Sequence, residues 1–396
     1  MINNLIAREM SATLEGIFNH LPIITITGPR QSGKTTLCRS LFTGLPYVNL
    51  EDLALRAQIM ADPKAFLEQH NEGVIIDEVQ NTPEIFSYLQ VAVDEDRFTE
   101  KRQRHFVVTG SNNFSLMEKV TQSMAGRTAV LSLLPLSTNE ILSYRPQTTT
   151  SEIIINGGFP ALWTASDEAR RLLLSNYYST YIERDVRQML NISNMNAFQL
   201  FVRLCASRIG QEFNMQSISN EVGVTVSTIS HWTSILNASY ITFTLNPYFS
   251  NIGKRLTKTP KLYFYDTGLA AYLLGIDSIE QLDVHPLRGN LFENMVVNDF
   301  IKFGTNRGLN QHIYFYRDKS QHEVDLLLDS PSGIKAYEIK SSRTWNADFF
   351  KNLNYLKKVL GNRLSSATVI YDGDQETPHA TDATINFRHI NRLLDN

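Results

Sequence analysis

The sequence predicts an α/β protein in which two α/β regions flank a largely helical middle. Three observations lead to this prediction. A β-branched run at residues 23–27 leads directly into a glycine-containing turn and then into a helical pattern. Short apolar runs then alternate with helical patterns, as expected for a parallel sheet with helices on both faces. In the last third of the chain, an amphipathic helix precedes a second series of strand-like runs.

The composition is that of an ordinary globular protein and limits the possible partners. Of 396 residues, 42% are hydrophobic and 19% are charged, and the formal net charge is −3, so only a local basic patch could hold nucleic acid. Cys38 and Cys205 lack the spacing of metal ligands or of a disulfide framework. No apolar run approaches membrane-spanning length, and the N-terminal segment does not resemble a signal peptide. We therefore expect a cytoplasmic protein without a membrane partner.

A phosphate-binding motif follows the first strand. Four residues separate Gly28 from Gly33, and Lys34 and Thr35 come directly after it. A glycine-rich turn brings backbone N–H groups close to phosphates, the lysine adds a positive charge, and the threonine hydroxyl can bind Mg²⁺. Because the sequence contains no guanine-reading motif, we expect ATP with Mg²⁺. The residues expected at the nucleotide are Gly28, Pro29, Arg30, Gln31, Ser32, Gly33, Lys34, Thr35 and Thr36.

Two carboxylates end a later strand of the same region. Strand candidates after the first are Tyr47–Leu50, Val74–Ile76, Phe106–Thr109 and Thr128–Leu131. The second of these runs into Asp77 and Glu78. Asp77 is expected to hold Mg²⁺ through a water, and Glu78 to polarise the attacking water as a general base. The alternative is a pair of solvated acids at a strand end.

Two further polar positions are candidates for contact with the γ-phosphate. Ser111 or Asn112 follows the next strand and could sense this phosphate, although Ser111 could equally cap a helix. Arg127 follows Gly126 just before the last strand of this region. Its guanidinium could reach the nucleotide of a neighbouring subunit, as an arginine finger does, or it could be an ordinary surface arginine.

These motifs, in this order, resemble those of the AAA+ ATPases. More narrowly, the chain is similar to the prokaryotic archaeal-ATPase type, in which an ATPase domain precedes a winged helix and a nuclease-like domain. The resemblance implies a central phosphate-binding strand, with the sensor strand between it and the strand that ends in Asp77. It also implies ATP hydrolysis and a homo-oligomer. The expected domains are the AAA+ P-loop ATPase domain at 1–145, a helical lid at 146–195, a winged helix at 196–275 and the nuclease-like domain at 285–396.

The middle of the chain suggests a winged helix with little capacity to read DNA. Residues 137–151 are rich in serine and threonine and suggest a linker. Ile218–Val222, Gly223 and Ser227–Leu236 fit a helix–turn–helix, with Ile229, Trp232 and Leu236 turned inward. The second helix contains no lysine or arginine, which argues against strong sequence-specific binding. Its side chains expected to be exposed are Ser227, Thr228, Ser230, His231, Thr233 and Ser234.

A basic stretch after the helix–turn–helix is a candidate for binding a phosphate backbone. It contains Lys254, Arg255, Lys258 and Lys261. A solvated loop is the alternative. A helix N-cap at Asp266 follows the next strand candidate.

The C-terminal region contains a pattern of acidic residues and one lysine. Glu293 lies on a helix, Asp325 near the start of a strand, and Glu338 and Lys340 on one face of the next strand. Together they could hold Mg²⁺, with Lys340 orienting or deprotonating a water for attack on a phosphodiester. This order resembles the restriction-endonuclease-like superfamily, although Val324 stands where proline is frequent. A docking module on a nuclease-like scaffold is the alternative.

The resulting hypothesis is an ATP-hydrolysing switch or motor that acts on nucleic acid and carries a nuclease-like C-terminal domain. The rival hypothesis is an ATP-regulated interaction protein whose inactive C-terminal domain docks a protein partner. A DNA-binding ATPase that never cuts is a third.

Overall fold

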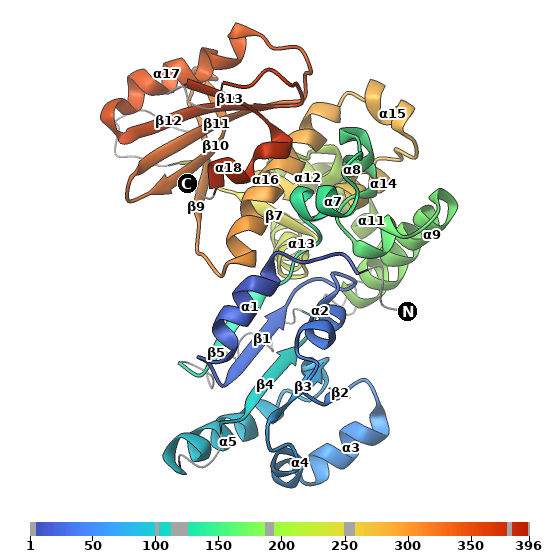
Figure 1. Ribbon diagram of the computed structural model, residues 1–396. Helices are drawn as coiled ribbons and strands as arrows, with labels where there is room; N and C mark the ends of the chain where they lie inside the picture. Colours follow the sequence, from blue (N-terminus) through green and yellow to red (C-terminus); the bar gives the residue numbers. More distant parts are fainter. Residues whose placement is uncertain are drawn as a thin grey trace. The chain divides into compact units, whose positions relative to one another are not determined.

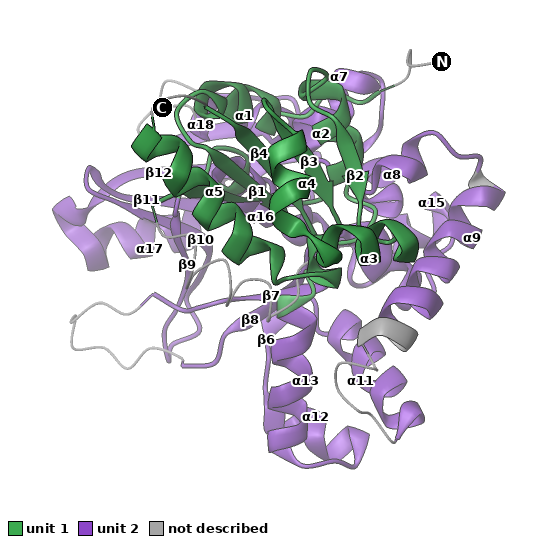
Figure 2. Cartoon of the chain, turned by 90° about the horizontal axis from the view of Figure 1, so that it is seen from below, with its two compact units in different colours: residues 1–135, 238–240, 305–309 green, residues 136–237, 241–304, 310–396 purple. Residues whose placement is uncertain are grey.

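The computed structural model describes residues 5–99, 103–111, 126–186, 194–248, 258–377 and 382–394. The chain forms two compact units (Figure 2). Unit 1 comprises residues 1–135, 238–240 and 305–309, and unit 2 comprises residues 136–237, 241–304 and 310–396. The two units meet in the sequence at residues 135 and 136, before the boundary at 145 that the sequence suggested.

Unit 1 is built around a five-stranded parallel sheet with the order β2-β3-β4-β1-β5 (Figure 1). Since all neighbouring strands are parallel, their carboxyl ends meet at one edge of the sheet. That edge carries the phosphate-binding loop after β1 and Asp77 at the end of β3. The strands are β1 (Ile23–Thr27), β2 (Tyr47–Asn49), β3 (Gly73–Asp77), β4 (His105–Thr109) and β5 (Thr128–Ser132).

Helices cover both faces of this sheet, as the sequence predicts. Alternate residues of β1 point to opposite faces, so Ile24 and Ile26 pack with residues of α1 and α2, whereas Ile23 packs with residues of α3, α4 and α5. Cys38 is buried on the first face. The helices are α1 (Met10–Phe18), α2 (Lys34–Leu41), α3 (Leu53–Ala61), α4 (Pro63–Gln69) and α5 (Ile85–Thr99).

The strand order agrees with the predicted fold in one respect and corrects it in another. The strand β4 lies between β1 and β3, as the resemblance implies. The phosphate-binding strand β1 is not central, however, because only β5 lies beyond it and β4 is the middle strand.

Unit 2 opens with helices where a linker was expected. Ser137 and Glu140 form a capping box at the start of α7, and Thr149 and Glu152 form another at the start of α8. In each box the hydroxyl accepts a backbone N–H three residues on, and the glutamate accepts the N-cap N–H. The serine and threonine residues that suggested a linker are therefore partly helix caps.

The remaining helices of unit 2 lead to a small antiparallel sheet and a long helix. The three-stranded sheet has the order β6-β8-β7, with β6 (Gln211–Glu212), β7 (Thr242–Leu245) and β8 (Lys261–Phe264). The helices are α7 (Thr138–Tyr144), α8 (Thr150–Asn156), α9 (Asp167–Tyr177) with a π-helical continuation (Tyr178–Val186), α11 (Met195–Ser207), α12 (Met215–Val222), α13 (Val226–Ala238), α14 (Thr267–Leu273), α15 (Ile279–Val284) and α16 (Arg288–Asn306).

Helices α12 and α13 occupy the positions expected for the helix–turn–helix. Gly223 ends α12 in a left-handed conformation with a φ of 75°. Ile229, Trp232 and Leu236 of α13 are buried, as predicted. Thr233, which was expected to be exposed, is buried, and its hydroxyl donates to the carbonyl of Ile229 at 2.7 Å, which satisfies the buried polar group.

The predicted cap at Asp266 is confirmed and has a second role. One carboxylate oxygen accepts from the Leu269 N–H of α14 at 2.8 Å, and the other accepts from the Gly158 N–H at 2.6 Å. A Cβ at Gly157 would lie 2.4 Å from this carboxylate. The turn at residues 157–158 therefore needs glycine, because it wraps closely around a buried acid.

The C-terminal part of unit 2 is a five-stranded mixed sheet with the order β13-β12-β11-β10-β9. Neighbours from β9 to β11 are antiparallel, and those from β11 to β13 are parallel. Helix α17 (Lys351–Leu360) packs on this sheet through Leu353, Leu356 and Leu360. The strands are β9 (His312–Arg317), β10 (Glu323–Ser330), β11 (Gly333–Lys340), β12 (Leu364–Tyr371) and β13 (Asp382–Asn386), and α18 (Asn391–Leu394) follows.

Candidate functional site

The phosphate-binding loop joins β1 to α2 and depends on glycine at both ends. Gly28 has a φ of 141°, and a Cβ there would lie 2.3 Å from the carbonyl oxygen of Leu133. Gly33 has a φ of 93° and directly precedes α2. Glycine adopts such angles without steric strain and lets the main chain approach its neighbours closely. The loop thus places the first N–H groups of α2 at the carboxyl edge of the sheet, an arrangement suited to phosphate.

The other loop positions differ in exposure. Arg30, Gln31 and Thr36 are exposed, whereas Pro29 and Ser32 are buried. Arg8, which the sequence analysis missed, donates to the Ser32 carbonyl at 2.7 Å and to the Leu134 carbonyl at 2.6 Å. It thereby ties the loop to the segment after β5. Nothing in its sequence context marks Arg8, because it precedes its helix and acts over long sequence distances.

Lys34 is a buried cation whose nearest hydrogen-bond acceptors are neutral. Its ammonium donates to the carbonyl oxygens of Gly28 at 3.0 Å and Pro29 at 2.7 Å, and the residue is 6% exposed. Burial lowers the pKa of Lys34 from 10.5 to about 8, although the carboxylates of Glu78 and Asp77 partly oppose this shift. An arriving phosphate would supply the negative charge that the two carbonyls lack.

Asp77 collects hydroxyl donors from three neighbouring elements. Its Oδ2 accepts from Thr35 at 2.8 Å and from Tyr47 at 2.7 Å, and its Oδ1 accepts from the hydroxyl of Thr109. Thr35 and Asp77 were expected to share a Mg²⁺ ion, and they are direct neighbours. Tyr47 and Thr109 were missed as parts of this site, because in the sequence each is simply a residue of a strand candidate.

Glu78, the expected general base, is tethered to the expected sensor through a third residue. It has a φ of 56°, a left-handed conformation that turns the chain sharply after β3. The amide of Gln80 donates to the Glu78 carboxylate and to the hydroxyl of Ser111 at 3.1 Å. Gln80 therefore links the two strand ends. Asn112, the other sensor candidate, lies outside the described residues.

Arg127 lies at the opposite edge of the sheet from the phosphate-binding loop. It directly precedes β5, whose first residue, Thr128, pairs with Ile23 at the start of β1. The loop begins after Thr27, so roughly 13 Å of strand separates the two positions. The guanidinium forms a two-pronged ion pair with Asp94 of α5, at 2.8 and 2.9 Å, which holds the pKa of that carboxyl below its usual range. Arg127 is thus placed away from the nucleotide site of its own chain.

In unit 2, the structure brings the acidic residues and the lysine of the nuclease-like pattern together. Asp325 of β10 accepts from the Ile339 N–H of β11 at 2.7 Å. Lys340 lies 2.7 Å from Glu338 and 3.9 Å from Asp325. The second oxygen of Glu338 is buried without a hydrogen-bond partner among the described residues. Burial, and to a lesser extent the negative charge of Asp325, raises the pKa of Glu338 to about 8. Glu293 of α16 completes the group.

Lys261 is a further member that the sequence analysis assigned elsewhere. Its ammonium lies 3.0 Å from Glu293, 2.6 Å from Glu323 and 3.9 Å from Asp325. The residue is 1% exposed, so it cannot present its charge to a phosphate backbone as the basic stretch suggested. Lys254 and Arg255 of that stretch lie outside the described residues.

The expected Mg²⁺ site in unit 2 does not fit this arrangement. Within the described ranges, no group of three or more His, Cys, Asp or Glu side chains is arranged to hold a metal ion. Glu293, Asp325 and Glu338, the expected ligands, are interleaved with two ammonium groups instead. A divalent ion placed here would be repelled by the positive charge of these two ammonium groups and would overlap the space that they occupy.

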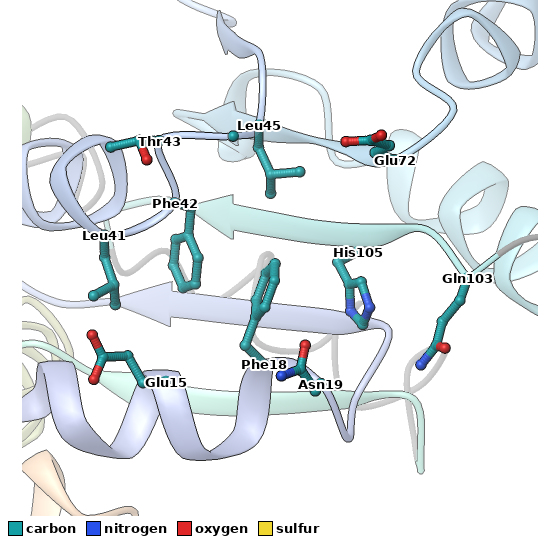
Figure 3. Close-up of a pocket in the computed structure, with 11 residues that line it drawn as sticks. Glu15, Phe18, Asn19, Leu41, Phe42, Thr43, Leu45, Glu72, Gln103 and His105 are labelled. Carbon is teal, nitrogen blue, oxygen red and sulfur yellow. The ribbon is translucent and has the colours of Figure 1, made fainter.

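A separate cavity of about 510 Å³ lies in unit 1 at the edge of the sheet where β1 and β4 begin (Figure 3). Its aromatic wall is Phe18, which stacks on Phe42 and lies against His105 with ring centroids 4.7 Å apart in each pair. Glu15 and Glu72 add polar groups to the lining. The cavity is at the opposite end of the strands from the phosphate-binding loop and shares no residue with it.

A search of the described helices for one long and apolar enough to cross a bilayer found none.

Comparison with protein families divides the chain into three matched segments. Residues 20–142 match the family described as an AAA domain. Residues 147–280 and 288–390 match two domains of unknown function, DUF8612 and DUF4143. Uncharacterized proteins of Mycobacterium tuberculosis and Mycobacterium bovis are each 28% identical over 374 residues, which cover 94% of this chain and 81% of the relative.

Three solved structures are among those similar to this chain. The Walker-type ATPase PABY2304 of Pyrococcus abyssi has a TM-score of 0.48 and 13% identity, over 69% of this chain and 97% of that chain. Cdc6p of Pyrobaculum aerophilum has a TM-score of 0.28 and 15% identity, over 70% and 93%. A RuvB variant of Thermotoga maritima has a TM-score of 0.31 and 16% identity, over 60% and 88%. The parallel sheet, the loop after β1 and the match of residues 20–142 to the AAA domain family show that the fold of unit 1 is similar to that of P-loop ATPases.

Proposed function

We propose that the chain binds ATP and hydrolyses it at the carboxyl edge of the parallel sheet of unit 1. The observation that supports this most strongly is the convergence there of a buried cation with neutral partners, Lys34, and two carboxylates, Asp77 and Glu78. The AAA family match covers the same residues. An anionic substrate with a bound cation would satisfy both kinds of group.

Each residue has a distinct role in this proposal. The backbone N–H groups of the loop and Lys34 bind the phosphates. Thr35 and Asp77 would hold Mg²⁺, which neutralises charge on the phosphate oxygens. Glu78 accepts a proton from the attacking water, and Gln80 fixes the direction of the Glu78 carboxylate. The hydroxyls on Asp77 keep its carboxylate in place beside Thr35.

Phosphate release from Mg²⁺-ATP by the purified full-length chain tests this proposal. The Lys34→Ala variant should lose ATP binding, and with it hydrolysis, because the charge facing the phosphates is removed. Lys64→Ala is the matched control, since Lys64 is an exposed lysine that forms a surface ion pair with Glu68 at 3.9 Å. Equal binding of ATP by wild type and Lys34→Ala, measured by calorimetry, would refute the site.

For unit 2 we infer a role in binding a protein partner, controlled by ATP turnover, rather than nucleic acid. Three observations support this choice. Helix α13 contains no lysine or arginine, Lys261 is buried among carboxylates, and the net charge is −3. Helices α12 and α13 with β7 and β8 would then act as a winged helix that contacts protein. Phosphate-backbone binding relies on accessible basic side chains.

Fluorescence anisotropy with labelled duplex and single-stranded DNA at low ionic strength separates the two partner classes. We expect no saturable binding by wild type or by Glu78→Gln, with or without ATP. Saturable binding that weakens steeply with salt would overturn the protein-partner role and favour action on nucleic acid.

A further inference from the structure

The acidic group of unit 2 forms one continuous chain of alternating charges. Glu323 accepts from Lys261 at 2.6 Å on one side and lies 3.1 Å from Arg317 on the other. Arg317 also reaches Glu212 of β6 at 3.4 Å. Each lysine or arginine of this charged cluster has at least two carboxylates within 4 Å. The members of the cluster are Glu212, Arg317, Glu323, Lys261, Glu293, Asp325, Lys340 and Glu338.

Lys261 contacts more carboxylates than any other cation of this cluster. An ammonium has three N–H donors, and Glu293 and Glu323 take two of them at hydrogen-bond distance. Asp325 lies within ion-pair distance of the same nitrogen, at 3.9 Å. Lys261 therefore sits among the carboxylates that a divalent ion would have to bridge.

Aromatic residues of β8 and β9 hold the Lys261 side chain in this position. Tyr263, two residues along β8, donates its hydroxyl to Glu293 at 2.6 Å. The ring of Phe315 in β9 lies 5.5 Å from the Lys261 ammonium. The segment directly after β7 of the small sheet also forms a bridge to β9 of the mixed sheet, between Pro247 and Phe315. Lys261 is thus fixed by contacts from both sheets.

We propose that the Lys261 ammonium occupies the position that a divalent metal ion would take in this carboxylate cluster. Its ion pairs connect the small sheet to the mixed sheet. The cluster therefore stabilises the fold of unit 2 and is not a hydrolytic centre. This inference concerns unit 2 and does not depend on ATP hydrolysis in unit 1. It explains why carboxylates arranged like metal ligands along the sequence are not arranged as a metal site in the fold.

Calorimetric titration of the full-length chain with Mn²⁺ tests the proposal. Wild type and Asp325→Asn should give the same titration, because any Mn²⁺ taken up near Asp77 is common to both. Lys261→Met removes the ammonium, keeps an unbranched side chain, and should bind Mn²⁺ at least about tenfold more tightly than wild type. The double variant Lys261→Met with Asp325→Asn should lose that gain.

The matched control is Lys335→Met. Lys335 lies on β11 like Lys340, but on the opposite face of the strand from Glu338, so its removal changes the net charge equally without opening the cluster. It should leave Mn²⁺ binding unchanged. A folded Lys261→Met variant without the gain would overturn the role of the ammonium.

Wild type and Asp325→Asn together keep the proposal testable even where Lys261→Met fails to fold. Mn²⁺ uptake by wild type that disappears in Asp325→Asn would show a working metal site and overturn the inference. Nicking of plasmid DNA by wild type, lost in Asp325→Asn, would do the same. ATP hydrolysis should be equal in wild type and Asp325→Asn, which separates this result from a failure of the ATPase proposal.

Discussion

Two buried lysines illustrate how unit 1 and unit 2 differ. Lys34 donates to two backbone carbonyls, and burial lowers its pKa to about 8. Lys261 is also desolvated, but the carboxylates around it, with Glu293 foremost, outweigh this and hold its pKa well above the usual value. The buried lysine of unit 1 therefore has only neutral hydrogen-bond acceptors among the described residues, whereas that of unit 2 is paired with carboxylates.

The carboxylates show the complementary difference. Asp77 accepts hydrogen bonds from the neutral hydroxyls of Thr35, Tyr47 and Thr109. Asp325 lies between two ammonium groups, those of Lys261 and Lys340. A cation can approach a carboxylate held by hydroxyls, whereas it is repelled from one already flanked by cations. The hydroxyls around Asp77 leave its negative charge without a cationic partner at hydrogen-bond distance among the described residues, whereas the carboxylates of the unit 2 cluster already have lysine or arginine partners within 4 Å.

The largest effect that we predict separates the two lysines by their contribution to stability. Lys261→Met should lower the free energy of unfolding of unit 2 by about 3–5 kcal/mol, because it leaves buried carboxylates without their cation. Lys34→Met should change the free energy of unfolding of unit 1 by less than about 1 kcal/mol without nucleotide, since loss of an unfavourable buried charge offsets lost packing. Urea unfolding measures both.

The tryptophans make the two units distinguishable in this experiment. All three, Trp163, Trp232 and Trp345, belong to unit 2, so their fluorescence follows its unfolding, while hydrogen exchange in β1 and β3 follows unit 1. Comparable losses of unfolding free energy in the two variants would show that the partners of the ammonium do not determine its contribution to stability. That result would contradict the contrast between Lys34 and Lys261.

The next effect concerns Glu78, the carboxylate proposed to activate the attacking water. Glu78→Gln keeps the size of the side chain but removes its negative charge, so ATP should still bind while hydrolysis falls at least about 100-fold. Binding by calorimetry and phosphate release under steady state measure the two steps. Glu323→Gln is a control in unit 2 and should leave hydrolysis unchanged. Turnover by Glu78→Gln at the wild-type rate would remove Glu78 from the mechanism.

A smaller effect is expected from the residue that positions this carboxylate. Gln80→Ala removes the amide that contacts Glu78 and Ser111, so kcat should fall about tenfold with little change in KM. Gln80→Glu places a second acid beside Glu78 and should reduce kcat further. A change confined to KM would indicate that Gln80 acts in nucleotide binding instead.

Much of unit 1 could be predicted because its site is built from local sequence. Gly28, Gly33, Lys34 and Thr35 lie in one loop, and Asp77 and Glu78 end one strand, so spacing alone brings the groups to one edge of a parallel sheet. Tyr47 and Gln80 were missed, because hydrogen bonds between side chains of different elements leave no periodic pattern in the sequence.

The cluster of unit 2 was harder to predict because its decisive residue comes from another sheet. The spacing of Asp325, Glu338 and Lys340 correctly indicated that they lie together on adjacent strands. Lys261 stood in a basic stretch and its sequence context suggested exposure, but β8 carries it inward to Glu293 and Glu323. Sequence spacing indicates which acids converge, and it does not indicate which cation from elsewhere joins them.

The smallest effect is predicted for Arg127, which lies far from the phosphates of its own chain. Its guanidinium pairs with Asp94, and the pair is only partly exposed but lies at the surface, where ion pairs contribute little to stability. We expect Arg127→Ala to lower hydrolysis by no more than about threefold, less than Gln80→Ala, because a surface ion pair is a minor contribution. Asp94→Ala should behave like Arg127→Ala, since both changes break the same pair. A loss approaching that of Glu78→Gln, restored by mixing Arg127→Ala with Lys34→Ala subunits, would show instead that Arg127 completes the site of a neighbouring subunit. Hydrolysis per subunit would then rise with protein concentration.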